Sequence, residues 1–377
     1  MDFELSDEQR MLQDAARDLL VSRYDVGKRN TVLASASGWD RGTWSAMAEM
    51  GLTGLPFAEA DGGMGAGPVE VMAVLNEVGR SLAPEPLLDS VYVPGGVLAE
   101  TGSVQQRRRL IPDLAAGTLL LAYAHDEPGV RWPSTALSTK ADGHGTGWTL
   151  TGCKNPVLRG DCADLLVVSA SLPGGETGLF LVGTQISGVT RTPFRTPDGG
   201  RGAQLDFQGA QAELLTSGDA AAAAITAAEV RRVGALCAEA VGAMDEILRL
   251  TCAHLGSRKQ FGVPLSTFQT LTHRAADMYV RLELARSMSL YITMSLADGV
   301  VDPVIASRAK LVVNRSARHI GREAIQMHGG IGLTAEYPVG HHVMRLTSIE
   351  HTLGGSEEHL CVLSARIGSY DTVEIHG

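Results

Sequence analysis

The sequence predicts an α+β protein with three domains: an N-terminal helical domain (residues 1–118), a middle antiparallel β-barrel (residues 119–218) and a C-terminal four-helix bundle (residues 219–377). Two observations carry this prediction. Apolar residues repeat with the helix period up to about residue 118, then form short β-type runs, and return to the helix period from Asp219 onward. The length of 377 residues also exceeds the roughly 250–300 residues at which one hydrophobic core stops growing, so several domains are expected.

The N-terminal region carries start and stop signals for several helices. Ser6 and Gln9 have the spacing of a capping box, in which each side chain accepts a hydrogen bond from the other residue's backbone N–H. An apolar run at helical spacing ends at Gly51, a residue type that commonly terminates helices. A further helix is predicted over residues 69–82, because Pro84 breaks the helical pattern.

The middle region contains short runs rich in β-branched and aromatic residues, separated by Gly, Pro and Asp. The runs are Leu119–Ala124, Trp148–Thr151, Leu165–Ser169, Gly178–Val182, Val189–Phe194 and Ala203–Phe207. Their even spacing, with no helix between them, favours an antiparallel barrel or sandwich over alternating βαβ units.

The C-terminal region predicts four long amphipathic helices with short connections. The first begins near Asp219, the second follows Pro264, and the third begins at Pro303 and ends at Gly329. A fourth follows Pro338. Short loops between amphipathic helices are typical of an antiparallel bundle.

Composition excludes several classes of function. The net charge of −10 comes without a basic stripe, so nucleic acid is not an expected partner. No run of about 18 apolar residues predicts a membrane span, and the acidic N-terminus does not resemble a signal peptide. The five cysteines form neither a CxxC pair nor a metal-ligand spacing, so we expect reduced thiols in a cytoplasmic protein and no metal site.

Two motifs in the C-terminal half indicate a cofactor. They are Arg258-Lys-Gln-Phe-Gly262 and Gln326-Met-His-Gly-Gly-Ile-Gly332. A guanidinium fork matches a pyrophosphate, amide side chains donate hydrogen bonds, and glycines let the backbone approach a ligand closely. The residues predicted to bind the cofactor are Arg258, Gln260, Phe261, Gln269, Gln326, Gly329 and Gly330. Taken singly, Arg258 is better explained as a helix C-terminal charge and the glycine pair as a helix stop; the two motifs together favour the cofactor.

The domain order and these motifs together resemble the acyl-CoA dehydrogenase family over nearly the whole chain. The resemblance implies that FAD lies across a subunit interface, where the two motifs hold the ADP half of a flavin whose ring sits in the neighbouring subunit. It implies an acyl-CoA thioester as substrate, which loses an α-proton to a carboxylate and a β-hydride to the flavin. It also implies an electron-transfer flavoprotein as electron acceptor.

The family's catalytic carboxylate is missing. Most members carry a Glu at the position of Gly354, and a minority carry it at the position of Arg232; neither residue accepts a proton near neutral pH. The resemblance therefore gives this chain no catalytic residue of its own. Five nearby carboxylates are alternative positions for a relocated base: Glu229, Glu239, Glu350, Glu357 and Glu358.

The segments that surround the flavin ring in the family also differ. The chain reads Asp126-Glu-Pro-Gly-Val-Arg-Trp-Pro133 where a Thr and a Ser contact the flavin and thioester, and Lys154-Asn-Pro-Val-Leu-Arg-Gly160 where a Trp and a hydroxyl pack on the ring. This pattern is similar to the non-base subunit of heterotetrameric (α2β2) acyl-CoA dehydrogenases, best known for steroid side-chain thioesters. His328-Gly-Gly and Leu353-Gly-Gly match that subunit. The partner would then carry the catalytic Glu.

Two alternatives stay open at this point. One is a self-sufficient homotetramer with a relocated carboxylate, or a relative with oxygen chemistry that needs no base. The other is a partner with a structural or regulatory role that binds no flavin.

Overall fold

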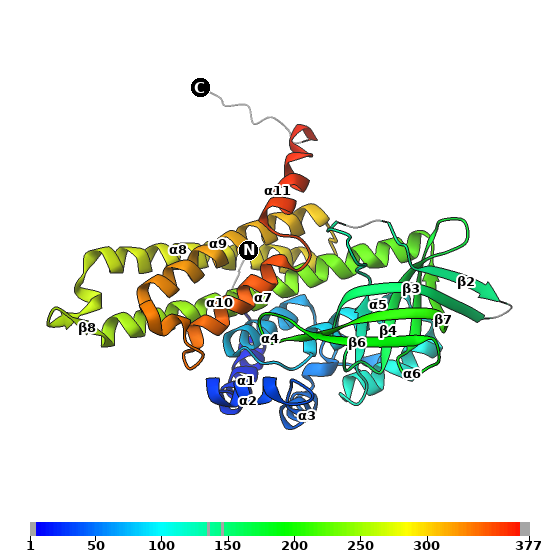
Figure 1. Ribbon diagram of the computed structural model, residues 1–377, viewed down its shortest axis with the longest axis horizontal. Helices are drawn as coiled ribbons and strands as arrows, with labels where there is room; N and C mark the ends of the chain where they lie inside the picture. Colours follow the sequence, from blue (N-terminus) through cyan, green and yellow to red (C-terminus); the bar gives the residue numbers. More distant parts are fainter. Residues whose placement is uncertain (1–4, 134–135, 145–146, 370–377) are drawn as a thin grey trace.

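The computed structural model describes residues 5–133, 136–144 and 147–369. A helical layer, a twisted sheet and a set of long helices follow one another along the chain, and the sheet lies at one end of the long helices (Figure 1). The coarse architecture predicted from the sequence is confirmed: helices first, then strands, then helices. The domain boundaries at residues 118 and 218 stay a prediction.

The N-terminal helices begin with the predicted capping box. Ser6 Oγ accepts from the Gln9 backbone N–H at 3.2 Å, and Gln9 Oε1 accepts from the Ser6 N–H at 2.9 Å. Gly51, with a φ of 82°, lies directly after the third helix, as its position in the sequence predicts. The helices are α1 (Asp7–Arg23), α2 (Val26–Ala34), α3 (Arg41–Glu49), α4 (Pro68–Ser81), α5 (Val93–Thr101) and α6 (Val104–Ala115), with 3₁₀ turns η1 (Leu52–Gly54) and η2 (Glu59–Asp61) and a π-helical segment η3 (Leu87–Tyr92).

The middle region corrects the prediction of an antiparallel barrel. Its described strands form one seven-stranded sheet in which β4 pairs with β1 and β5, but meets β2 only at a parallel bridge between Lys140 and Ser171. The β1–β4 pair is also parallel, which is feasible because residues 125–164 supply the long connection that parallel strands need. The strands are β1 (Leu121–Ala124), β2 (Lys140–His144), β3 (Gly147–Leu158), β4 (Leu165–Ser171), β5 (Thr177–Gly183), β6 (Val189–Arg195) and β7 (Arg201–Ser217).

The C-terminal helices pack as a bundle around α7. The first of them, α7, has 39 residues and therefore spans about 58 Å at 1.5 Å per residue. The elements are α7 (Asp219–Ser257), the hairpin β8 (Lys259–Gln260) and β9 (Val263–Pro264), η4 (Leu265–Thr267), α8 (Gln269–Ala297), α9 (Pro303–His328), η5 (Gly329–Leu333), α10 (Pro338–His351), α11 (Ser356–Ser364) and η6 (Ile367–Ser369). Two helices share the span after Pro338, where the sequence predicted one.

The N-terminal helices are fixed to the bundle by close backbone contact. A Cβ on Gly79 of α4 would lie 1.9 Å from the Glu239 carbonyl of α7, and one on Gly242 of α7 would lie 1.8 Å from the Asn76 carbonyl. Only glycine lets the two helices approach this closely.

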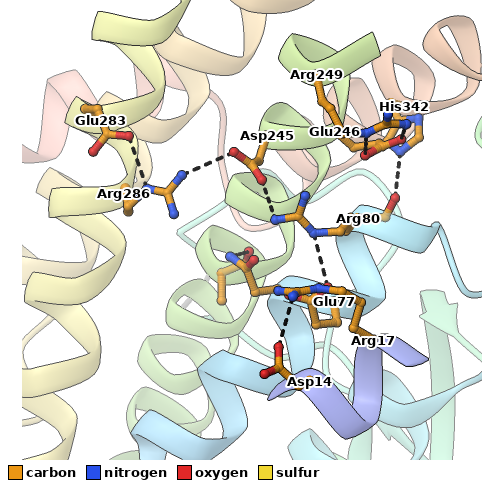
Figure 2. A network of polar contacts seen from close by, with 12 residues as sticks. Asp14, Arg17, Glu77, Arg80, Asp245, Glu246, Arg249, Glu283, Arg286 and His342 are labelled. Atoms are coloured by element: carbon orange, nitrogen blue, oxygen red, sulfur yellow. Dashed lines mark hydrogen bonds and ion pairs between the residues drawn. The ribbon is translucent and has the colours of Figure 1, made fainter. Parts of the chain in front are cut away.

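A chain of alternating charges reinforces this crossing (Figure 2). Glu77 is fully buried and accepts from Arg17 of α1 at 2.9 Å and from Arg80 at 3.1 Å. Arg80 also pairs with Asp245 of α7, which in turn accepts from Arg286 of α8 at 3.3 Å. These five charged side chains, from Arg17 to Arg286, therefore link α1, α4, α7 and α8.

Candidate functional site

The first cofactor motif forms the tip of the bundle. Arg258 caps the C-terminus of α7 through its backbone N–H, and its carbonyl accepts from the Leu265 N–H at 2.8 Å, which closes the β8–β9 hairpin. Phe261 and Gly262 form the turn with φ values of 53° and 82°, the signs that a tight two-residue hairpin requires. Phe261 is 92% exposed, and its ring meets Phe268 edge-on at 6.0 Å.

The second motif lies beside the first because α7 and α9 end at the same place. The rings of His254 on α7 and His328 on α9 have their centroids 4.5 Å apart. Gly329 ends α9 with a φ of 63°, and nothing lies within 4 Å of a Cβ on either Gly329 or Gly330. The backbone is therefore open to a ligand or to another chain at this point.

The structure brings the seven predicted cofactor residues to this one end of the bundle. Each of them is exposed on the chain: Arg258, Gln260, Phe261, Gln269, Gln326, Gly329 and Gly330. Figure 1 shows the hairpin at the end of the molecule away from the sheet. Because α7 contacts the sheet near its start and reaches this tip about 58 Å later, one flavin cannot contact both regions of the same chain. We call this set of residues the bundle tip.

An indole ring packs against Gly354, the position that the resemblance assigns to the family base. Gly354 has a φ of 88°, and a Cβ there would lie 2.4 Å from Cε3 of Trp132. Trp132 also packs on His359, with ring centroids 4.4 Å apart, and its Nε1 donates to Glu229 Oε2 at 3.4 Å. Sequence comparison places Trp132 where the family has a Ser against the flavin, but it does not indicate that the ring covers Gly354. We call Trp132, Gly354, His359 and Glu229 the closed centre.

His359 holds the turn that contains Gly354. Burial, together with the nearby Lys310 charge, lowers the pKa of His359 to about 4, so the ring is neutral near pH 7. The neutral ring donates from Nε2 to the Leu353 carbonyl at 3.0 Å. The Gly355 N–H donates to Glu358 at 3.1 Å, so Glu358 is engaged as a helix cap.

At the alternative base position, which the resemblance assigns to Arg232, the side chain is a buried cation in an ion pair. Arg232 is 7% exposed, and its Nη2 donates to Asp89 of η3 at 2.9 Å. Together with Tyr123, His125 and Glu229 it encloses a space that has no room for a water molecule. A thioester therefore has no place beside Arg232.

The five candidate carboxylates differ in their surroundings. Glu239 pairs with Arg345 at 2.6 Å and Glu350 pairs with Arg318, whereas Glu357 lies exposed. Glu229 is the exception: burial raises its pKa to about 7, and the nearby Asp126 charge acts in the same direction against the hydrogen bond from Trp132. The sequence did not distinguish Glu229 from the other four.

A cavity of about 300 Å³ lies between the sheet, α2, α7 and α10, and none of the four closed-centre residues lines it. Pro156 and Leu158 line it, at the positions where the resemblance places the Trp and the hydroxyl that pack on the flavin ring. Arg159 spans one side and donates to the Pro84 carbonyl at 2.6 Å. The described residues that line this cavity include no Trp, Tyr or Phe, so it offers no aromatic wall to a flavin ring.

Two protein-family models match this chain, one in its N-terminal part and one in its C-terminal part. Models of the N-terminal and C-terminal domains of acyl-CoA dehydrogenase match residues 6–118 and 221–368. A solved variant of the Tcur3481-Tcur3483 steroid ACAD is 31% identical, covers 96% of this chain and 98% of its own, and superposes with a TM-score of 0.89. The chain belongs to the acyl-CoA dehydrogenase family.

Other members of the family extend over the same length. Acyl-CoA dehydrogenase FadE28 of Mycobacterium tuberculosis is 28% identical over 97% of this chain and 99% of its own. The ChsE4-ChsE5 complex from the same species has the same fold, with a TM-score of 0.89 at 24% identity over 99% of this chain and 100% of that one. The predicted family and its reaction class, flavin-dependent acyl-CoA dehydrogenation, are therefore confirmed.

The predicted cofactor is confirmed for the family. A glutaryl-CoA dehydrogenase of this fold from Mycobacterium smegmatis was solved in complex with FADH2 (TM-score 0.89, 22% identity, 98% of this chain and 97% of that one). The two regions of this acyl-CoA dehydrogenase differ in how they fit FAD. The open backbone and exposed guanidinium of the bundle tip suit an ADP group, whereas the closed centre and the cavity lined by Pro156 and Leu158 do not suit the ring. In the part of the chain that the structure describes, no helix has the length and apolarity of a membrane span.

Proposed function

We propose that this chain is the non-base subunit of a heteromeric acyl-CoA dehydrogenase, and that it lends its bundle tip to an FAD whose ring lies in an unlike partner subunit. The observation that carries the proposal is the packing of Trp132 on Gly354, because the indole fills the space into which a base at this position would project. The ion pair between Arg232 and Asp89 removes the alternative position in the same way.

In the proposed assembly, the bound FAD would supply a hydride acceptor for the β-carbon of the acyl thioester. The residues of this chain bind and orient the ADP half. Arg258 would pair with the pyrophosphate, the backbone N–H groups of Gly329 and Gly330 would donate to phosphate oxygens or to the adjoining ribityl oxygens, and Phe261 would cover one side. The side-chain amides of Gln260, Gln269 and Gln326 supply further donors. The α-proton goes to a Glu of the partner subunit.

Further parts of the proposal rest on the relatives and on the resemblance. The steroid ACAD supports a CoA thioester of a steroid side chain as the substrate, and the ChsE4-ChsE5 complex supports an assembly of unlike subunits. An electron-transfer flavoprotein is the proposed electron acceptor, and the cytoplasm the proposed location. The domain boundaries at residues 118 and 218 belong to the same proposal.

Flavin stoichiometry tests this function. Co-expression with a family member that carries the catalytic Glu should give a stable complex with one FAD per unlike pair, measured by absorbance at 450 nm against protein concentration. The chain expressed alone should hold little flavin. A homotetramer of this chain with one FAD in every subunit would contradict the proposal.

A second candidate function is supported by Glu229. This partly buried carboxylate has a pKa of about 7, lies one helical turn before Arg232, and makes no ion pair with a Lys or Arg among the described residues. A carboxyl group with such a pKa is suited to accept a proton near neutral pH. A rotation of Trp132 away from Gly354 would be needed to admit a thioester, after which Glu229 would act as a relocated base in a self-sufficient enzyme.

A further inference from the structure

The outward face of α8 and α9 carries a cluster of positive charge. It surrounds a hollow of about 460 Å³ lined by Arg281, Arg315, Arg318, His319, Arg322 and Glu323. The whole chain has a net charge of −10, so this face is opposite in sign to the average of the molecule. A local cluster of this kind determines which charges can approach the face.

Three of these arginines have no carboxylate of their own. Arg318 pairs with Glu350, and Glu323 is taken by Arg274. Arg281, Arg315 and Arg322 are exposed and make no ion pair with any residue in the described ranges. If another protein surface covered them without supplying carboxylates, it would bury three unpaired cations, which is strongly unfavourable.

An apolar stripe runs beside the arginines. Val280, Leu284 and Tyr291 of α8 are 56%, 46% and 42% exposed. Their spacing of four and seven residues places them on one face of the helix, next to Arg281. Apolar side chains grouped on a surface and flanked by charge are typical of a protein-binding face. We call the three arginines and this stripe the α8–α9 face.

We propose that the α8–α9 face binds an unlike subunit of the same fold whose matching face is acidic, and that its arginines prevent two copies of this chain from pairing. The inference rests on the proposed heteromer and adds the surface that selects the partner. In a two-fold pair of identical chains, a patch on one copy meets the same patch on the other. Arginines would then face arginines, whereas an acidic counterpart would both neutralise them and cover the stripe.

A charge-reversed copy of the chain is the probe for this surface. The variant R281E/R315E/R322E keeps the shape of the face and reverses its charge. Mixed with the wild type at low salt, it should form a one-to-one dimer, detected by native mass spectrometry from the mass difference. The mixed dimer should be roughly tenfold or more tighter than either self-dimer and should weaken steeply with added salt. The matched control K28E/R108E/R195E changes the net charge equally on distant exposed positions and should form no mixed dimer.

A neutral variant covers the case in which the reversed copy does not fold. In R281Q/R315Q/R322Q the repulsion is removed but the stripe remains, so self-association should rise above that of the wild type. Mixed dimers no tighter than self-dimers, or unchanged self-association of the neutral variant, would overturn the inference. Neither assay involves flavin, so a failure here is distinct from a failure of the flavin stoichiometry that tests the proposed function.

Discussion

Gly330 and Gly354 both lie in glycine pairs that follow bundle helices, yet their surroundings are opposite. At the bundle tip, nothing lies within 4 Å of a Cβ on Gly330, whereas at the closed centre a Cβ on Gly354 would meet the indole of Trp132 at 2.4 Å. An open glycine keeps the backbone accessible to something outside the chain, and a packed glycine makes room for the chain's own side chain. The contrast supports the proposed heteromer, in which the bundle tip faces a neighbouring subunit and Trp132 fills the position of the base.

Alanine substitutions at the two glycines should give the largest difference in unfolding free energy between the two regions. Gly354→Ala places a methyl group against Trp132 at a positive φ, so we expect a loss of about 3–4 kcal/mol in the free energy of unfolding. Gly330→Ala should change it by less than about 0.5 kcal/mol. Urea denaturation of both variants measures the difference. In the Gly354→Ala background, Trp132→Ala should cost less than it does alone, and strict additivity would show that the indole does not limit this site.

The closed centre should also be sensitive to acid. The pKa of His359 is about 4 in the folded chain and near 6.5 in the unfolded chain, so the unfolded state binds the proton first as pH falls. The stability from the neutral ring is complete above pH 6.5 and is lost between pH 6.5 and 4. Its size is on the order of 2–3 kcal/mol. Burial also lowers the pKa of His125 to about 4, so this histidine likewise reduces the stability of the fold as pH falls. The raised pKa of Glu229 has the opposite effect on stability, in the range between its usual pKa and about 7.

His359→Phe separates the contribution of this one histidine. Phenylalanine retains a ring against Trp132 but does not titrate, so the unfolding free energy of the variant should fall less between pH 7 and pH 4 than that of the wild type. Chemical denaturation at both pH values measures this. Parallel curves for the two proteins would show that His359 is not held neutral by the centre.

A substitution in the bundle tip should change the affinity for FAD and leave the stability of the fold unchanged. Arg258→Ala removes a charge-assisted contact to the pyrophosphate, which costs roughly 1.5–3 kcal/mol, or one to two decades in FAD affinity of the heteromeric complex. The melting temperature of the isolated chain should stay within experimental error, because Arg258 is exposed. Arg195→Ala, an exposed arginine of β6, is the matched control. Unchanged flavin content in the Arg258 variant would show that Arg258 does not bind FAD and only places a positive charge at the end of α7.

The sequence predicted the helices better than the strands, for a physical reason. Helix signals are local, as in the capping box of Ser6 and Gln9, which the structure confirms. Strands with a solvated face lack an apolar run, so β2 and the second half of β7 were not predicted. The parallel β1–β4 pair depends on contacts between distant segments and has no local signature.

The candidate site divides in the same way. The prediction that Gly354 and Arg232 stand at the base positions of the family came from the sequence, because the resemblance fixes those positions by nearby motifs. The packing of Trp132 on Gly354 could not, because it joins two segments far apart in the chain. Nor could the raised pKa of Glu229, which results from burial that only the fold creates. Spacing in the sequence identifies which groups are present, while the fold determines which of them are accessible.

Anaerobic reduction of flavin by the isolated chain tests whether this chain has a catalytic base of its own. The chain is incubated with excess FAD and with an acyl-CoA that a base-bearing relative oxidises, and absorbance at 450 nm is followed with that relative as the positive control. Loss of a general base alone typically slows such a reaction about 10²–10⁴-fold. A chain without its own base should show no bleaching above background, either as the wild type or as Glu229→Gln. Bleaching by the wild type that disappears in Glu229→Gln would contradict the account and establish Glu229 as a relocated base.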